Sequence, residues 1–146
     1  MKNSNKKAFT LIEMLVVLAI IGILAALSVP YSISYLNGVK HSKSLDQTIS
    51  LMRKAQSYAM NDKSGGPWGI CLSNGQIKLY GGSCNAPTYQ NVYTIPGNTE
   101  ITGLSDIEFE NNTGNPDSET TILIHTGRFK NTITINNVGG MAVVNN

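Results

Sequence analysis

Few side chains in this sequence have the type and spacing that chemistry requires. The two histidines, His41 and His125, have no acid–nucleophile arrangement near them, so both are expected to be structural. Asp106, Glu108 and Glu110 alternate and would share one face of a β-strand, where carboxylates can bind calcium or, more ordinarily, face solvent. No glycine-rich loop is expected between a strand and a helix, which is the arrangement that binds phosphate groups. We therefore expect no catalytic site, no metal site and no cofactor.

The cysteines offer a cross-link rather than a metal site. Cys71 and Cys84 are the only two, and a zinc site needs three or four ligands at set spacings. In an oxidising compartment they would form a disulfide, whereas otherwise they would remain two buried thiols. About a dozen residues separate them, a loop for which a disulfide contributes roughly 3 kcal/mol. We expect the disulfide if this part of the chain is exported.

One carboxylate, Glu13, lies near the start of a long apolar segment. No charged residue occurs from Met14 to Val29, and Leu11–Val29 is about 19 residues, or about 28 Å as a helix, which matches the hydrocarbon core of a membrane. An ionised carboxylate in such a span costs on the order of 3 kcal/mol. A partner charge would offset this cost, and the nearest candidate is the α-amine that forms if the chain is cut just before Phe9.

Three lysines, Lys2, Lys6 and Lys7, precede the apolar segment. Basic residues stay on the cytoplasmic side of a membrane helix, so everything after Pro30 is expected to face outward. Two simpler interpretations stay open. The segment could be a plain membrane anchor, or it could be a secretory signal, because the small residues at 26–28 are similar to a signal-peptidase site. Neither interpretation explains a carboxylate inside the span.

Length and charge limit the remaining possibilities. The chain has 146 residues, which is enough for one ordinary domain. Eleven basic and nine acidic side chains give a net charge of +2, and after the first eight residues eight basic and nine acidic side chains remain. This near-neutral balance excludes a strongly basic nucleic-acid-binding protein and a chain that charge keeps disordered.

The stretch Ala8-Phe9-Thr10-Leu11-Ile12-Glu13, followed by the apolar segment and Pro30, resembles the class III signal of the type IV pilin and type II secretion pseudopilin family. The resemblance implies that a prepilin peptidase cuts between Ala8 and Phe9 and N-methylates Phe9. It also implies that Glu13 guides assembly. The sequence departs from the family's pattern at Ala8, because the family usually has glycine before the cut.

The same resemblance implies a structural subunit of a type IV pilus or a type II secretion pseudopilus. Before assembly it would be a single-pass protein of the inner (cytoplasmic) membrane with its head outside. Its implied partners are the prepilin peptidase, other pilin or pseudopilin subunits, a platform protein and an assembly ATPase. The order of features in the head resembles the H-type minor pseudopilins and the FimT-like minor pilins. Those features are Leu51–Gln56, a tryptophan-bearing first strand, Ile107–Phe109 and Gly139-Gly140.

The distribution of apolar residues predicts four regions, namely a leader at 1–8, a transmembrane and assembly helix at 9–30, an amphipathic helix at 31–62 and a β-rich head at 63–146. In the amphipathic helix we expect an apolar stripe at 4-3-4-3 spacing. Its members are Leu45, Ile49, Met52, Gln56 and Ala59. The polar run at 61–67 should end the helix.

Short apolar runs separated by polar turns predict strands after Pro67. Asn74-Gly75 between two such runs favours a hairpin. The expected strands are 68–72, 76–80, 91–95, 106–110, 120–125, 131–136 and 141–144. The predicted fold class is α+β, with a long N-terminal helix, transmembrane and then amphipathic, packed on a C-terminal antiparallel β-sheet or small β-sandwich head, as in the pilin fold.

Two other functions stay open. Arg128 and Lys130, which alternate in an expected strand, and Lys78 on another strand could line a groove that binds the phosphates of DNA. The chain would then be a DNA-binding minor pilin that acts in DNA uptake. Alternatively, it could be a simple membrane-anchored or secreted β protein without any role in assembly.

Overall fold

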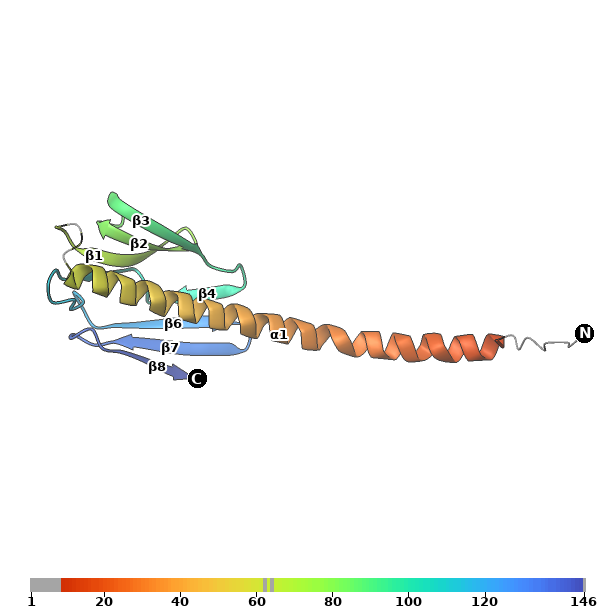
Figure 1. Cartoon of the computed structure of the whole chain (residues 1–146). Helices are drawn as coiled ribbons and strands as arrows, with labels where there is room; N and C mark the ends of the chain where they lie inside the picture. Colours follow the sequence, from red (N-terminus) through yellow and green to blue (C-terminus); the bar gives the residue numbers. More distant parts are fainter. Residues whose placement is uncertain (1–8, 62, 64, 146) are drawn as a thin grey trace, which may run out of the picture. The chain divides into compact units, whose positions relative to one another are not determined.

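The computed structural model describes residues 9–61, 63 and 65–145. The chain divides into two units, of which the first ends at Leu36 and the second is Asn37–Asn146. One long helix, α1 (Leu11–Met60), begins in the first unit and continues into the second (Figure 1). The predicted leader at 1–8 lies outside the described residues.

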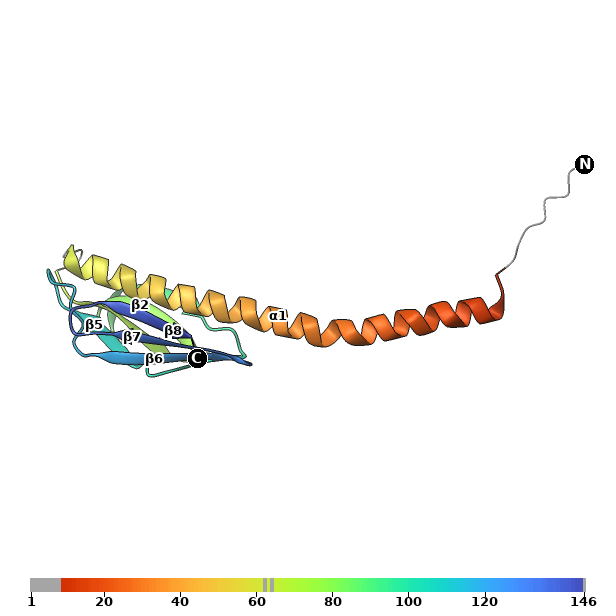
Figure 2. The ribbon, with the colours of Figure 1, turned by 90° about the horizontal axis from the view of Figure 1, so that it is seen from below.

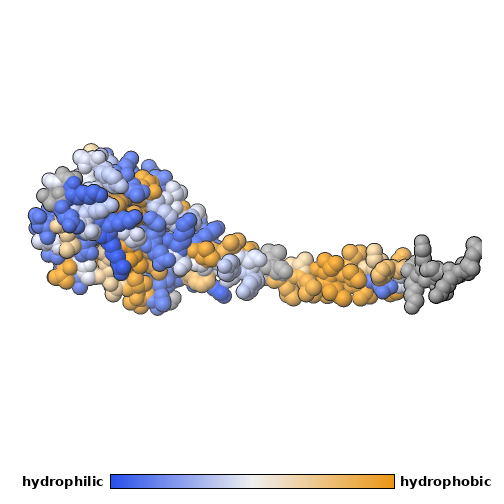
Figure 3. All heavy atoms as spheres, viewed as in Figure 1, coloured by the Kyte–Doolittle hydropathy of each residue, from blue (hydrophilic) through white to orange (hydrophobic). Residues whose placement is uncertain are grey.

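In the first unit, α1 exposes a continuous apolar surface. Every described side chain from Phe9 to Leu27 is exposed, and an apolar window near the start of the helix has a mean hydropathy of 2.7. Figure 3 shows this apolar surface in orange, with few polar side chains among it. By length and composition this part of α1 can cross a membrane.

In the second unit, one face of α1 is buried against the head. The predicted stripe is right for Met52 and Ala59, which are fully buried, but Leu45 and Ile49 are only half-buried. The fully buried residues near the start of this face are instead Ser44 and Thr48, each one position before the predicted residue. The buried helical residues are His41, Ser44, Thr48, Leu51, Met52, Ala55 and Ala59.

Besides His41, two of these buried residues, Ser44 and Thr48, are polar, and the hydropathy pattern missed them. The Thr48 hydroxyl donates to the Ser44 carbonyl oxygen at 2.7 Å, so its hydrogen bond is satisfied within the helix. Both side chains are small, which lets this part of α1 lie close to the strands beneath it. The burial of Thr48 therefore follows from its size and internal hydrogen bond, whereas the buried Ser44 hydroxyl has no hydrogen-bond partner among the described residues, so that only its small size favours burial.

The helix ends at Met60, directly before the polar run at 61–67 that was expected to end it. Both the backbone N–H and the side-chain amide of Asn61 donate to the Ser57 carbonyl oxygen, at 3.2 and 2.6 Å. This carbonyl belongs to the last turn of α1 and would otherwise lack a partner. The polar run after Met60 thus stops the helix by satisfying its end.

The head contains two antiparallel four-stranded sheets, with the strand orders β3-β2-β1-β5 and β4-β6-β7-β8. The antiparallel architecture confirms the predicted fold class. The first sheet consists of β1 (Trp68–Ser73), β2 (Gln76–Gly82), β3 (Pro87–Thr94) and β5 (Asp106–Phe109). The second consists of β4 (Thr99–Thr102), β6 (Thr120–Thr126), β7 (Phe129–Ile135) and β8 (Met141–Asn145).

The predicted hairpin at Asn74-Gly75 joins β1 to β2. Ser73 pairs with Gln76, so the loop has two residues, and both have a positive φ of 51° and 69°. This is the left-handed geometry that a two-residue hairpin turn requires and that asparagine and glycine adopt most easily.

The sequence pattern missed β4 and misplaced one cation. β4 is only four residues long, and Ile101 is its sole buried side chain, so it lacks an apolar run that could be recognised. It forms because β6 offers it a pairing edge. Arg128, expected in a strand, lies instead in the tight turn between β6 and β7, where Thr126 pairs with Phe129.

The core lies between α1 and the inward faces of both sheets. Figure 2 shows the second-unit part of α1 lying along the strands. The largest buried side chains are Trp68, Tyr80, Phe109, Leu51, Met52, Leu79 and isoleucines of β1, β2, β5, β6 and β7. Trp68 contacts the ring of Tyr58 on α1 edge-on, with ring centroids 4.8 Å apart. Buried aromatic and aliphatic side chains therefore stabilise the packing of this part of the helix on the sheets.

Candidate assembly site

The amino-terminal end of α1 is capped by Thr10. The backbone N–H of Glu13 donates to the Thr10 hydroxyl at 3.3 Å, and Glu13 lies in the first turn of the helix. A threonine followed three residues later by glutamate is the spacing of a capping box. Thr10 was not predicted to have a role, although its spacing from Glu13 is a recognisable signal in the sequence.

The position of Glu13 at the helix amino terminus offsets only part of the energetic cost of a carboxylate in an apolar span. A carboxylate near a helix amino terminus gains about 0.3–1 kcal/mol from the helix dipole. Its cost inside an apolar span is on the order of 3 kcal/mol, which is larger. Within the described residues no cation pairs with Glu13. A charge from outside these residues is therefore still needed to offset the cost when the helix lies in lipid.

The residues around Glu13 form an exposed apolar surface. Phe9 is 76% exposed and Leu11 is 79% exposed, and the large hydrophobic residues that follow are exposed as well. An uninterrupted apolar surface of this length is stable only against lipid or other apolar helices. Phe9 is described, whereas Ala8 on the other side of the predicted cut lies outside the described residues.

His41 is structural, as predicted. Its ring is buried, with Nε2 2.6 Å from Asn131 Oδ1 and Nδ1 3.3 Å from the Thr126 hydroxyl. The Asn131 amide also donates to Asn145 on β8, so its oxygen accepts from His41 Nε2. The Thr126 hydroxyl lies 2.9 Å from that of Thr99. His41 thus joins α1 to four strands of the second sheet through this hydrogen-bond network.

The three alternating carboxylates do not converge on one site. The Tyr80 hydroxyl donates to Asp106, and it lies 3.3 Å from Glu108 Oε1. Burial, together with the two carboxylates, raises the pKa of the Tyr80 phenol, which therefore remains protonated and a donor. Glu110 instead accepts from the Thr113 hydroxyl at 2.9 Å. Within the part of the chain that the structure describes, no group of three metal-ligating side chains occurs.

Of the three cations considered for DNA binding, two lie on different sheets and the third lies in a turn. Lys78 is on β2 in the first sheet, whereas Lys130 is on β7 in the second. The exposed Arg128 lies in the β6–β7 turn, two residues before Lys130 in the sequence, with its guanidinium 5.3 Å from the Phe129 ring centroid. Lys130 also lines a hollow of about 240 Å³ together with Glu100 and His125.

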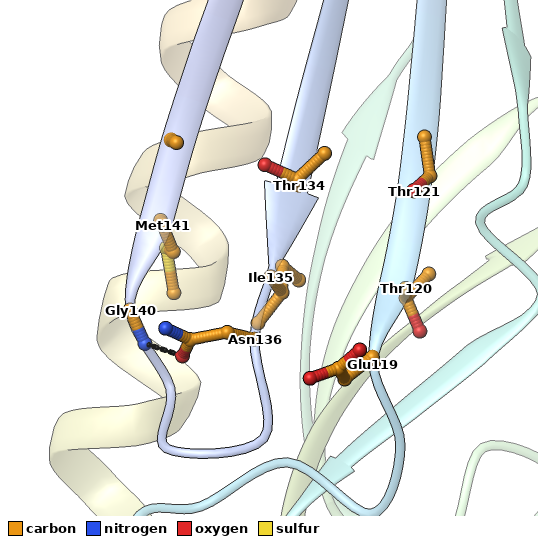
Figure 4. Close-up of a pocket in the computed structure, with 9 residues that line it drawn as sticks. Glu119, Thr120, Thr121, Thr134, Ile135, Asn136, Gly140 and Met141 are labelled. Atoms are coloured by element: carbon orange, nitrogen blue, oxygen red, sulfur yellow. Dashed lines mark hydrogen bonds between the residues drawn. The ribbon is translucent and has the colours of Figure 1, made fainter.

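A second hollow, of about 600 Å³, lies at the ends of β6, β7 and β8 (Figure 4). Its lining contains threonine hydroxyls, Met141 and one carboxylate, Glu119. The Asn136 side-chain oxygen accepts from the backbone N–H of Gly140 at 2.6 Å and from that of Val138 at 3.2 Å. Asn136 is therefore used to shape the β7–β8 turn, and this hollow offers no catalytic arrangement.

The structure joins Cys71 and Cys84 by a disulfide, as the sequence predicts for an exported segment. Cys71 is buried on β1, and Cys84 lies in the loop that follows β2. The bond therefore ties the β2–β3 connection to the strand beside it.

Replacing both cysteines, as Cys71→Ala with Cys84→Ala, should lower the free energy of unfolding by about 3 kcal/mol, because the denatured chain regains the entropy of an open loop. Thermal unfolding of the full chain in detergent measures the change. A reductant should destabilise the parent chain to the level of the double variant and leave the variant itself unaffected. An equal response of both proteins to the reductant would contradict the prediction.

Comparisons with known proteins address the two parts of the chain separately. Residues 3–29 match the model of the prokaryotic N-terminal methylation motif. The fold is similar to that of the minor pseudopilin EpsH from the type 2 secretion system of Vibrio cholerae, with a TM-score of 0.56 and 10% sequence identity. The match covers 73% of this chain and 97% of the pseudopilin chain. A comparison with curated proteins found no significant match.

The structural similarity concerns the fold alone. The methylation motif is a separate similarity in sequence, and it lies at the amino terminus. The apolar part of α1 that overlaps this motif is long and apolar enough to cross a membrane. The chain therefore has a prokaryotic N-terminal methylation motif at residues 3–29 and a fold similar to that of a minor pseudopilin.

Proposed function

We propose that the chain is a prepilin that matures by cleavage between Ala8 and Phe9 and assembles through α1 into a type IV pilus or a type II secretion pseudopilus. The observation that carries the proposal is the methylation motif at 3–29, which ends in an exposed apolar helix with one carboxylate. In this proposal the leader is 1–8, the assembly helix is 9–30, the helix packed on the head is 31–62 and the head is 63–146.

Cleavage changes how the helix is held in the membrane. Lys2, Lys6 and Lys7 anchor the uncut chain on the cytoplasmic side, because moving a charged side chain through the hydrocarbon core is costly. Once they are removed, the helix can leave the bilayer lengthwise. Its apolar surface then passes from lipid to the helices of neighbouring subunits, which are equally apolar.

Glu13 sets the axial position of each subunit in this proposal. The new amine of Phe9 in one subunit pairs with the Glu13 carboxylate of its neighbour. Removing one partner of a desolvated ion pair costs about 3–5 kcal/mol, so a shifted register that leaves the pair unmade is strongly disfavoured. Thr10 supports this role, because its hydroxyl caps the turn of the helix that contains Glu13.

The proposed partners follow from these steps. A prepilin peptidase removes the leader, a platform protein and an assembly ATPase move the subunit out of the inner membrane, and other pilin or pseudopilin subunits receive it. The head remains on the outer side of that membrane. An oxidising compartment there is consistent with the Cys71–Cys84 disulfide.

A structural role is favoured over DNA binding. Lys78 is on a different sheet from Lys130, and Lys130 shares its hollow with the carboxylate of Glu100. A groove for phosphates needs several cations on one surface and no competing anion. DNA contact by Lys78, Arg128 and Lys130 therefore stays a prediction of the sequence, and we propose no second function.

The amino terminus of the mature protein tests the proposal. In cells with the prepilin peptidase, mass spectrometry of the purified chain should find a polypeptide that begins at N-methylated Phe9. The same chain from cells without the peptidase should retain residues 1–8. A mature protein that begins at Val29 would instead indicate ordinary secretion, and a retained leader in the presence of the peptidase would indicate a simple anchor.

A further inference from the structure

The two outermost strands of the head lack the charges that usually protect a sheet edge. No Asp, Glu, Lys, Arg or His occurs from Leu79 to Thr99, which includes β3, or from Asn131 to Asn146, which includes β8. The other two edge strands are short and acidic, with Glu100 on β4 and with Asp106 and Glu108 on β5.

Each uncharged strand has one unpaired edge. Among the described residues, β3 pairs only with β2, and β8 pairs only with β7. Figure 1 shows the two strands at opposite margins of the head. Pro87 and the irregularity at Gly81-Gly82 interrupt only the beginning of β3, so the remaining edge is regular. An open, regular and uncharged edge is a ready template for another strand.

Both strands also expose apolar side chains on each of their faces. On β3, Tyr89 and Val92 are 43% and 40% exposed, and their spacing places them on opposite faces. On β8, the neighbouring Val143 and Val144 are 44% and 51% exposed. Ile133, which pairs with Val143 on the adjacent strand, is fully buried. The apolar surface is therefore left open at these margins and would be covered if the sheet continued.

We infer that β3 of one subunit pairs with β8 of a second copy of this chain, so that the sheets of neighbouring heads continue into one another. The two edges are chemically matched, because neither has a charge that would be desolvated. They lie at opposite margins, so each copy can bind one neighbour at each side. Such a heterologous contact does not close, which is the geometry of a filament. Pairing of β3 with its own copy would form a closed dimer and leave both β8 edges open.

This inference rests on the proposed function, since a filament supplies the neighbouring copy. A photo-cross-linking amino acid, p-benzoylphenylalanine, placed at Gln90 of the full chain tests it. Gln90 is exposed on β3, so the replacement leaves the core intact. Cells producing isotopically light and heavy copies would be irradiated, and the processed protein digested with trypsin. Because residues 131–146 contain no lysine or arginine, trypsin leaves β8 intact within one peptide that begins at Asn131.

The expected result is a mixed light–heavy adduct between β3 and residues 131–146. Adducts confined to one copy, adducts to β3 of a second copy, adducts to a different pilin-like protein and the absence of any adduct would each overturn the inference. Maturation at Phe9 is scored in the same sample. Correct maturation without the mixed adduct would reject the strand pairing and leave the proposed function standing, whereas a failure to mature would reject the function itself.

A lysine introduced on β3 tests the pairing, and a lysine introduced on β4 is its matched control. Asn91→Lys introduces an ammonium group at an exposed position of β3 and should reduce the mixed adduct by about fivefold or more, because the charge would be desolvated by the incoming strand. Thr102→Lys places the same charge at an exposed position of β4 and should leave the adduct unchanged. Formation of the Cys71–Cys84 disulfide in both variants reports that the head has folded. Equal adduct yields from the two variants would contradict the inference.

Discussion

Glu13→Val should be inserted and cleaved normally but should fail to enter filaments. Valine removes the cost of a carboxylate in the apolar span, on the order of 3 kcal/mol, so membrane insertion is not impaired. In the assembled state it leaves the Phe9 amine of a neighbouring subunit desolvated and unpaired, which costs about 3–5 kcal/mol. We therefore expect incorporation of the variant alongside parent subunits to fall by about tenfold or more. Sheared filaments and membranes, compared by quantitative mass spectrometry, measure this fall.

Glu13→Gln distinguishes charge pairing from helix capping. The glutamine side chain keeps nearly the same size and can still take part in a capping box with Thr10, but it has no charge. If the role of Glu13 is charge pairing, Glu13→Gln should be as defective as Glu13→Val. Normal incorporation of the glutamine variant would show that the cap, and not the charge, is what assembly needs.

Gly69→Ala should severely destabilise the head. Tyr80 on β2 lies across Gly69 on β1 to reach Asp106 and Glu108 on β5. A methyl group at Gly69 would lie 2.5 Å from the Tyr80 hydroxyl oxygen and 2.6 Å from the Ile107 carbonyl oxygen. The second of these atoms is backbone, so the β1–β5 pair would have to separate. We expect a loss of about 3 kcal/mol in the free energy of unfolding, measured by denaturant unfolding of the full chain in detergent.

Gly97→Ala is the matched control for this prediction. Gly97 also belongs to the head, and a methyl group added there would meet nothing within 4 Å. Its stability should remain close to that of the parent chain. If Gly69→Ala proved as stable as Gly97→Ala, the close passage of Tyr80 over β1 would not exist in solution.

The features that the sequence predicted correctly depend on near neighbours along the chain. An uncharged run from Met14 to Val29 specifies an apolar helix wherever it occurs, and Asn74-Gly75 specifies a tight turn through its own backbone preferences. The end of α1 at Met60 follows from the polar residues that come next. The disulfide pairing was predictable because Cys71 and Cys84 are the only cysteines in the sequence.

The features that it missed depend on which distant segments meet. β4 is a strand only because β6 lies beside it, and Ser44 and Thr48 are buried only because the second-unit part of α1 lies close to the strands. The separation of Lys78 from Lys130 follows from the division of the strands between two sheets. None of these neighbours is adjacent in sequence, so no local pattern contains them.

By itself, the sequence determined the anchored apolar helix, its single carboxylate at Glu13 and the β-rich character of the head, because hydropathy and turn preference act over a few residues. Only the tertiary structure decided which strands form the edges of the sheets and which side chains cross between them. Strand pairing is a long-range choice made by backbone hydrogen bonds that every residue type can form, and for that reason side-chain patterns alone do not specify it.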